Sequence, residues 1–188
     1  MESNIKMNTY KEALNEYELE DENGKIKLVY TYFGVAVYFS QVLEETFSIM
    51  LWTNEIFEAK PKTNKQVKEI IEKIENSKKT MGNFLNEIKQ NYSLNEKTAN
   101  DLKSILKKRN YLIHKYFKIE IQKCYSDLGR REMLEYFGNF VDETKNIDSE
   151  LKKYYSEYTK KLGFTENKIN ELINQMKQEE LDREKNYS

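Results

Sequence analysis

The feature that most constrains this chain is a segment of more than thirty residues, 25–58, without a turn signal. The whole sequence holds one proline, Pro61, and six glycines. Proline and glycine are the residues that most strongly interrupt helices. The first half of the segment is rich in Val, Tyr, Phe and Thr, which also suits a strand. We predict one long helix instead, because no turn divides the segment.

Hydrophobic periodicity predicts helices along most of the remaining chain. Asp21 to Gly24 is expected to form a turn, and residues 59–64, with Pro61, a linker. Thr80 and Ser93 are expected to cap helices, since Ser93 has Glu96 three residues on, as in a capping box. A break is expected near 127–129, and Gly163 is expected to end a helix. The predicted helices cover residues 5–20, 25–58, 65–78, 80 onward, 93–122, 130–162 and 165–183.

This pattern predicts an all-α helical bundle with a C-terminal helical extension. We expect a short N-terminal helix and turn over 1–24 and a main helical domain over 25–162. A last helix with a frayed end of about five residues is expected over 163–188.

Composition narrows the class of protein. The single cysteine, Cys124, excludes an internal disulfide and a cysteine-based metal cluster, and it fits a reducing cytoplasm. No apolar signal segment is visible in residues 1–22. The uncharged run 28–43 is short and polar for a membrane span, so we expect a buried core helix and no membrane partner. The net charge is −1, so any contact with nucleic acid must be a local patch.

The residues 107–117 contain the only histidine of the chain, His114. Arg109 lies five positions earlier and is followed by Asn110. On a helix, Asn110 and His114 share a face and Arg109 lies on its flank. One face can therefore present a cation, an amide and an imidazole to one phosphate. His114 would transfer protons, Arg109 would hold the phosphate and stabilise its charge, and Asn110 would orient the imidazole or bind a phosphate oxygen.

Local charge also favours an anionic substrate. The segment 101–123 carries seven basic and two acidic residues, within a chain of net charge −1. We expect Lys107, Lys108 and Lys115 to contact RNA. No metal ligand cluster and no cofactor motif accompany the histidine, so we expect chemistry without either.

Each residue also has a simpler interpretation. A histidine on a lysine-rich helix is commonly solvated, and lysine runs are commonly solvated faces. Tyr111 and Tyr116 would then be packing residues. The acidic pair Glu44 and Glu45 would solvate a helix face, unless one of them pairs with Arg109.

The run Arg109-Asn110-Tyr111-Leu112-Ile113-His114 resembles the R-x4-6-H motif of the HEPN superfamily, with its usual polar residue after the arginine. With Tyr116, it also resembles the R-x4-H-x-Y pattern of HepT-type toxins. The specific match covers residues 105–117, and the helical layout extends it loosely over 28–160. The chain is longer than a compact HepT toxin.

The resemblance implies a metal-independent endoribonuclease that acts as a homodimer, with Arg109, Asn110 and His114 of two chains lining one basic cleft. It implies a toxin–antitoxin or phage-defence role. It also implies that Tyr116 is a possible site of adenylylation by a nucleotidyltransferase antitoxin.

Two other classes remain open. The Lys/Glu-rich half, 142–185, suits a non-catalytic helical adaptor that pairs with partner helices. A HEPN module that only binds nucleotides is the second. Loss of RNA cleavage in a His114→Ala variant would distinguish a nuclease from both.

Overall fold

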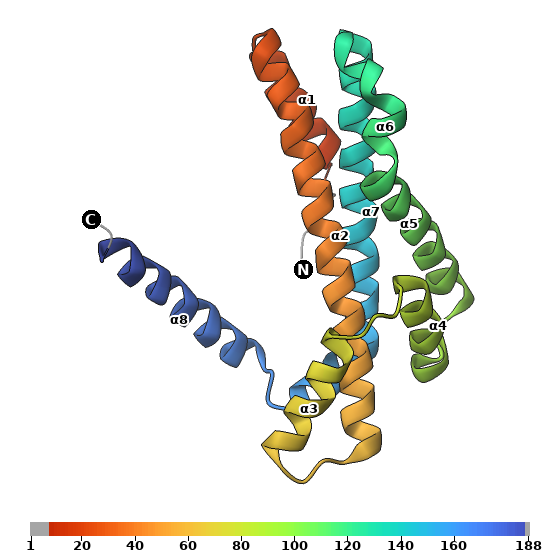
Figure 1. Ribbon diagram of the computed structural model, residues 1–188, viewed down its shortest axis with the longest axis vertical. Helices are drawn as coiled ribbons and strands as arrows, with labels where there is room; N and C mark the ends of the chain where they lie inside the picture. The colour runs from red at the N-terminus through yellow and green to blue at the C-terminus, as the bar shows by residue number, and fades with distance from the viewer. Residues whose placement is uncertain (1–7, 187–188) are drawn as a thin grey trace, which may run out of the picture.

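The computed structural model describes residues 8–186, and within that range every regular element is helical. The predicted all-α class is confirmed (Figure 1). The elements are α1 Thr9–Leu19, α2 Glu22–Ala59, α3 Asn64–Glu75, α4 Met81–Tyr92, α5 Glu96–His114, α6 Tyr116–Glu120, the short 3-10 helix η1 Ile121–Tyr125, α7 Asp127–Lys161 and α8 Glu166–Lys185.

The two longest helices, α2 and α7, lie side by side and run in the same direction (Figure 1). Phe33 meets Phe137 near one end, and the Thr46 hydroxyl donates to Asp148 farther along, at 2.5 Å. Helices α1 and α5 run the opposite way beside them. The bundle is therefore built on a parallel α2–α7 pair.

Each helix of the pair buries one apolar stripe. Side chains that recur three or four positions apart lie on one face of a helix, so such spacing produces a continuous stripe. Burying a large apolar side chain stabilises the fold by roughly 1.5–3 kcal/mol. The fully buried members include Leu43, Phe47 and Met50 of α2, and Met133, Leu134, Phe137, Phe140 and Leu151 of α7.

A buried arginine ties the start of this pair to its neighbours. Arg130 of α7 is 4% exposed and donates to the Tyr17 hydroxyl at 2.8 Å, to the Cys124 carbonyl at 2.9 Å and to Glu22 at 2.7 Å. A buried charge is costly unless it is paired and hydrogen-bonded. Because these partners come from α1, η1 and α2, one side chain holds four elements in register.

Several predicted boundaries are corrected. Asp21 caps α2 by accepting from the Gly24 amide at 2.7 Å, so the predicted turn is the start of a helix. Ser93 has φ 47° and ends α4, and the cap of α5 is Asn95, which accepts from the Thr98 amide at 2.9 Å. The predicted helix 93–122 is interrupted at Lys115, after which α6 and η1 follow.

Other boundaries agree or move slightly. Thr80 caps α4 in a capping box, and Gly163, at φ 91°, follows the end of α7, both as predicted. Ser126 accepts from the Gly129 amide at 3.0 Å, so α7 starts inside the expected break. Residues 5–7 of the first predicted helix lie outside the described residues. So do 187–188 of the expected frayed end, whereas α8 continues to Lys185.

Helix α2 alone among the described helices is long and apolar enough to cross a membrane by length and composition, with mean hydropathy 1.3 in its most apolar stretch. A single such helix is weak evidence, since core helices of soluble proteins pass the same test. Here one face of α2 forms the core, but only 28% of that stretch is buried within the chain. The opposite face of α2 is therefore left uncovered.

Helix α8 projects away from the bundle (Figure 1). None of its residues is buried. Its apolar side chains remain 40–68% exposed at Ile169, Leu172, Ile173 and Met176.

We expect Gly138→Ala to destabilise the protein by about 1–3 kcal/mol, the usual cost of forcing extra atoms into a packed site. A Cβ at Gly138 would lie 2.6 Å from the backbone nitrogen of Tyr10, so α1 would have to move off α7. Urea unfolding followed by circular dichroism measures the change. The matched control is Gly82→Ala on α4, where a Cβ meets only the Thr80 hydroxyl at 3.7 Å. Equal stability of the two variants would contradict the close α1–α7 contact.

Candidate functional site

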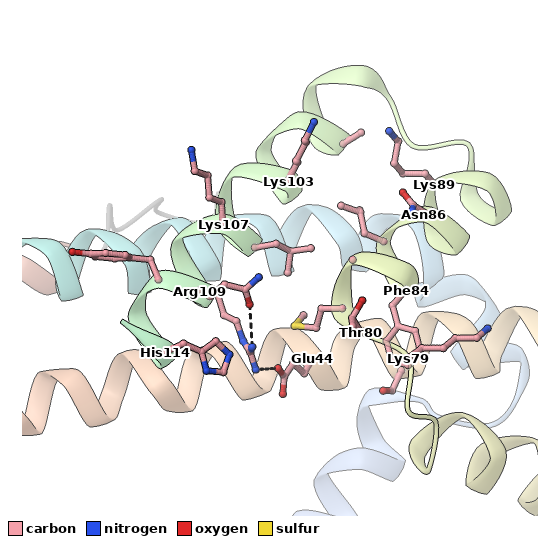
Figure 2. Close-up of a pocket in the computed structure, with 18 of the residues that line it drawn as sticks. Glu44, Lys79, Thr80, Phe84, Asn86, Lys89, Lys103, Lys107, Arg109 and His114 are labelled. Carbon is pink, nitrogen blue, oxygen red and sulfur yellow. Dashed lines mark hydrogen bonds and ion pairs between the residues drawn. The ribbon is translucent and has the colours of Figure 1, made fainter. Parts of the chain in front are cut away.

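A cleft of about 1400 Å³ lies between α2, α4 and α5 (Figure 2). Helix α2 contributes Glu44 and Ser48, and the loop before α4 contributes Lys79 and Thr80. Its lining includes six basic and two acidic side chains, in a chain whose net charge is −1. The cleft therefore concentrates positive charge at one place on a nearly neutral molecule.

Helix α5 brings the three motif residues to this cleft. Arg109, Asn110 and His114 all line it, as the motif predicted. The helix is oriented by its other face, where Leu102, Ile105 and Leu112 are buried, as are apolar side chains of the neighbouring α7. His114 is the last residue of α5, and both it and Asn110 are exposed. The imidazole is thus accessible from solvent.

Arg109 is held on both sides. Its Nη2 pairs with a carboxylate oxygen of Glu44 on α2, and its Nη1 donates to the Asn110 side-chain oxygen at 3.2 Å (Figure 2). The Arg109 side chain is only 18% exposed, and its Nε is buried without a partner among the described residues. These contacts fix the plane of the guanidinium. Asn110 thus orients Arg109.

The partner of Arg109 settles one alternative from the sequence. Either member of the acidic pair could have paired with Arg109, and the structure shows that it is Glu44. Glu45 lies one residue on, about 100° around the helix, and is exposed.

Of the three lysines expected to contact RNA, two line the cleft and one does not. Lys107 and Lys115 line the cleft. Lys108 points to the other side of α5 and pairs with Glu143 of α7 at 2.6 Å, because consecutive residues lie about 100° apart on a helix. Lys108 is therefore removed from the expected contact set.

The fold adds basic residues that sequence analysis missed. Lys79, Lys89 and Lys103 also line the cleft. Lys79 is paired with Glu87 at 2.7 Å, whereas Lys89, Lys103, Lys107 and Lys115 form no ion pair with the described residues. Sequence alone carried a signal only for Lys103, which lies in the basic segment. Lys79 and Lys89 reach the site because α4 packs against α5.

One charge of the basic segment 101–123, that of Lys123 at its end, is neutralised by neighbouring carboxylates. Lys123 pairs with Glu120 at 3.1 Å and with Glu132 at 3.0 Å. These carboxylates raise the pKa of Lys123. Its charge is satisfied within the protein and does not face the cleft.

The Tyr116 side chain is packed in the core and is not exposed to solvent. It is 3% exposed and lies against Tyr136 and Phe137, each with ring centroids 4.8 Å away. Burial raises the pKa of its hydroxyl. This agrees with the packing interpretation, and adenylylation of Tyr116 would first require local opening of α6.

Among residues 8–186, no three His, Cys, Asp or Glu side chains are grouped so that they could hold a metal ion. The groups in the cleft that can act on a bound molecule are the imidazole, the guanidinium, ammonium groups, amides, hydroxyls and the carboxylates of Glu44 and Glu75. This set can bind an anion and transfer protons.

Comparison with protein-family models, with curated proteins and with solved structures found no match to this chain.

Proposed function

We propose that this protein is a metal-independent endoribonuclease of the HEPN type that acts as a homodimer, in a toxin–antitoxin or phage-defence role. The observation that carries the proposal is that Arg109, Asn110 and His114 line one cleft together with four lysines that form no ion pair with the described residues. The resemblance of residues 105–117 to the HEPN motif supports the same function.

The size and charge of the cleft suit a polymer of phosphates. Its volume of about 1400 Å³ exceeds the roughly 300–1,000 Å³ of ordinary small-molecule sites. Lys89 comes from α4, Lys103 and Lys107 come from α5, and Lys115 directly follows α5, so basic side chains stand on two sides of the cleft. Ammonium groups spread along a groove bind successive phosphates and release their counterions.

The chemistry follows from the three motif residues. The 2′-hydroxyl oxygen attacks the adjacent phosphorus, the P–O5′ bond breaks, and the products carry a 2′,3′-cyclic phosphate and a 5′-hydroxyl. His114 accepts the 2′-hydroxyl proton or donates a proton to the departing 5′-oxygen. Arg109 stabilises the negative charge that builds on the phosphate oxygens. A second chain in the homodimer supplies an imidazole for the other proton transfer.

The ion pair with Glu44 has a consequence for binding. In the free protein, Glu44 occupies the guanidinium edge that a phosphate would use. A phosphate must displace this carboxylate or bind the remaining edge of Arg109. Because Arg–phosphate contacts are strong when bidentate, the strongest contact with a phosphate requires Glu44 to move away from Arg109.

The same ion pair also favours a second candidate, a module that binds nucleotides without cleaving them. An arginine already satisfied by Glu44 and Asn110 can be structural. Such a module binds RNA through the lysines but has no activity for His114 to support.

We expect His114→Ala to reduce RNA cleavage by about 10²–10⁴-fold, the usual contribution of a general acid or base. Binding should persist, because the lysines remain. The measurements are gel cleavage of a labelled RNA with single-stranded and hairpin parts, and its fluorescence anisotropy. Circular dichroism of the variant controls for folding. A wild-type protein that binds this RNA without cutting it would support the binding module instead.

We expect Lys103→Ala with Lys107→Ala to weaken RNA binding and to lower the slope of log affinity against log salt by about 0.7 per lysine. The matched control is Lys108→Ala, which removes the neighbouring lysine that faces Glu143. Equal effects of the single variants Lys107→Ala and Lys108→Ala would place the RNA outside this cleft.

We expect cleavage to continue in excess chelator and to stop when a 2′-deoxy nucleotide replaces the residue at the cut. The first result follows from His/Arg chemistry, and the second from attack by the 2′-oxygen. Denaturing gels and mass spectrometry of the product ends measure both. Activity that disappears with chelator and returns with a divalent ion would contradict the proposed chemistry.

A further inference from the structure

The uncovered face of α2 has a regular pattern that the nuclease chemistry does not use. Six of its exposed residues follow one another at alternating spacings of four and three. Such spacing places the six residues on one stripe of the helix, along which a second helix can pack. These six residues, which we call the α2 seam, are Lys27, Thr31, Gly34, Tyr38, Gln41 and Glu45.

The α2 seam is complementary to itself when reversed. If a second α2 runs antiparallel, with Ala36 at the same level in both chains, the seam residues meet in three kinds of layer. Lys27 meets Glu45, Thr31 meets Gln41, and Gly34 meets Tyr38. We propose that the α2 seam is the interface with a second copy of this chain, related by a twofold axis at the level of Ala36.

The outer layers pair opposite charges. Lys27 and Glu45 are both exposed, and neither forms an ion pair within residues 8–186. A twofold axis makes each layer occur twice, so the interface gains a Lys27–Glu45 pair at both ends. A parallel arrangement would place Lys27 beside Lys27 and Glu45 beside Glu45. The charges therefore select the antiparallel orientation.

The middle layers are polar but can be satisfied. The Thr31 hydroxyl donates to the Lys27 carbonyl at 3.0 Å, which leaves its oxygen free to accept. The Gln41 amide of the partner subunit can donate to that oxygen. Polar groups buried in an interface are costly unless they are paired, and this layer pairs them.

The inner layer explains a glycine that the single chain does not need. Glycine inside a helix is destabilising relative to alanine, yet a Cβ at Gly34 would meet nothing within 4 Å. Tyr38 is 60% exposed. In the antiparallel pair, the ring of the partner subunit's Tyr38 lies over Gly34, where a side chain would otherwise block it.

The surroundings of the α2 seam favour burial as well. No charged residue occurs between Lys27 and Glu44 on α2. Tyr30, beside the seam, is 50% exposed although its ring stacks on Phe117. Contact with a second copy can therefore cover this face without stranding a charge away from water.

The antiparallel dimer also determines where the two clefts lie relative to each other. This point alone depends on the proposed nuclease function. Helix α5 runs antiparallel to α2, and Arg109 pairs with Glu44. His114 lies about 7 Å farther along α5 in the direction of Ala36. Each cleft therefore extends toward the twofold axis, and the two imidazoles lie nearer to each other than the two Arg109–Glu44 pairs do.

The test is sedimentation velocity of the full chain over a range of concentrations. The wild-type protein should be a dimer that dissociates on dilution. Lys27→Glu and Glu45→Lys should each raise the dimer dissociation constant about tenfold or more, since each replaces two attractions by two repulsions. The double variant should restore the dimer, and so should an equal mixture of the two single variants.

Two further variants separate the interface from the stability of the chain. Gly34→Leu should weaken the dimer without lowering the melting temperature measured at concentrations where the protein is monomeric. Lys68→Glu, an exposed lysine on α3, should leave the dimer unchanged.

Several outcomes would overturn the proposal. They are a protein that stays monomeric at every concentration, a double variant that fails to restore the dimer, and dissociation caused by Leu172→Glu on α8 but not by Lys27→Glu. Binding of α2 to phospholipid vesicles by a monomeric protein would also overturn it. A dimer that never cleaves RNA would remove the nuclease proposal and leave this interface intact.

Discussion

The parallel packing of α2 against α7 is the contact on which the rest of this structure depends. Helix α5 packs on α7 through its apolar face, and α2 packs on α7 through its own. Arg109 and Glu44 therefore meet across a gap that neither helix defines alone. The hydrogen bonds that Arg130 donates to the Cys124 carbonyl and to Glu22 fix the position of α2 along α7. A shift of one turn there would separate Glu44 from Arg109 and change the floor of the cleft.

Sequence patterns predicted the elements better than their ends. Long stripes such as that of α2 arise from many side chains, so an error at one position does not remove the signal. Helix ends depend on single side chains. Ser93 and Asn95 are both good capping residues, and the sequence could not show that Ser93 takes the left-handed conformation while Asn95 accepts from Thr98. The break at Lys115 had no glycine or proline to mark it.

The candidate site was predictable where it lies on one helix and not where it is assembled from several. Helical geometry alone places Asn110 and His114 on one face and Arg109 beside them. It also places Lys107, three positions before Asn110 and seven before His114, on that face, and it turns Lys108 away from it. Lys79, Lys89 and Glu44 come from other elements, and only the packing of α4 and α2 around α5 brings them in. The burial of Tyr116 against α7 came only with the fold.

Helix α8 and the helical bundle differ in stability. A helix of this length with no buried residue has little tertiary support, and isolated helices are only marginally stable in water. We expect its hydrogen bonds to open with a much smaller free energy than those of α2 and α7, which open only when the core does. Heating would therefore remove helical signal gradually from the C-terminal end before the bundle melts. Proteases would reach the chain after Gly163 first and release a folded core.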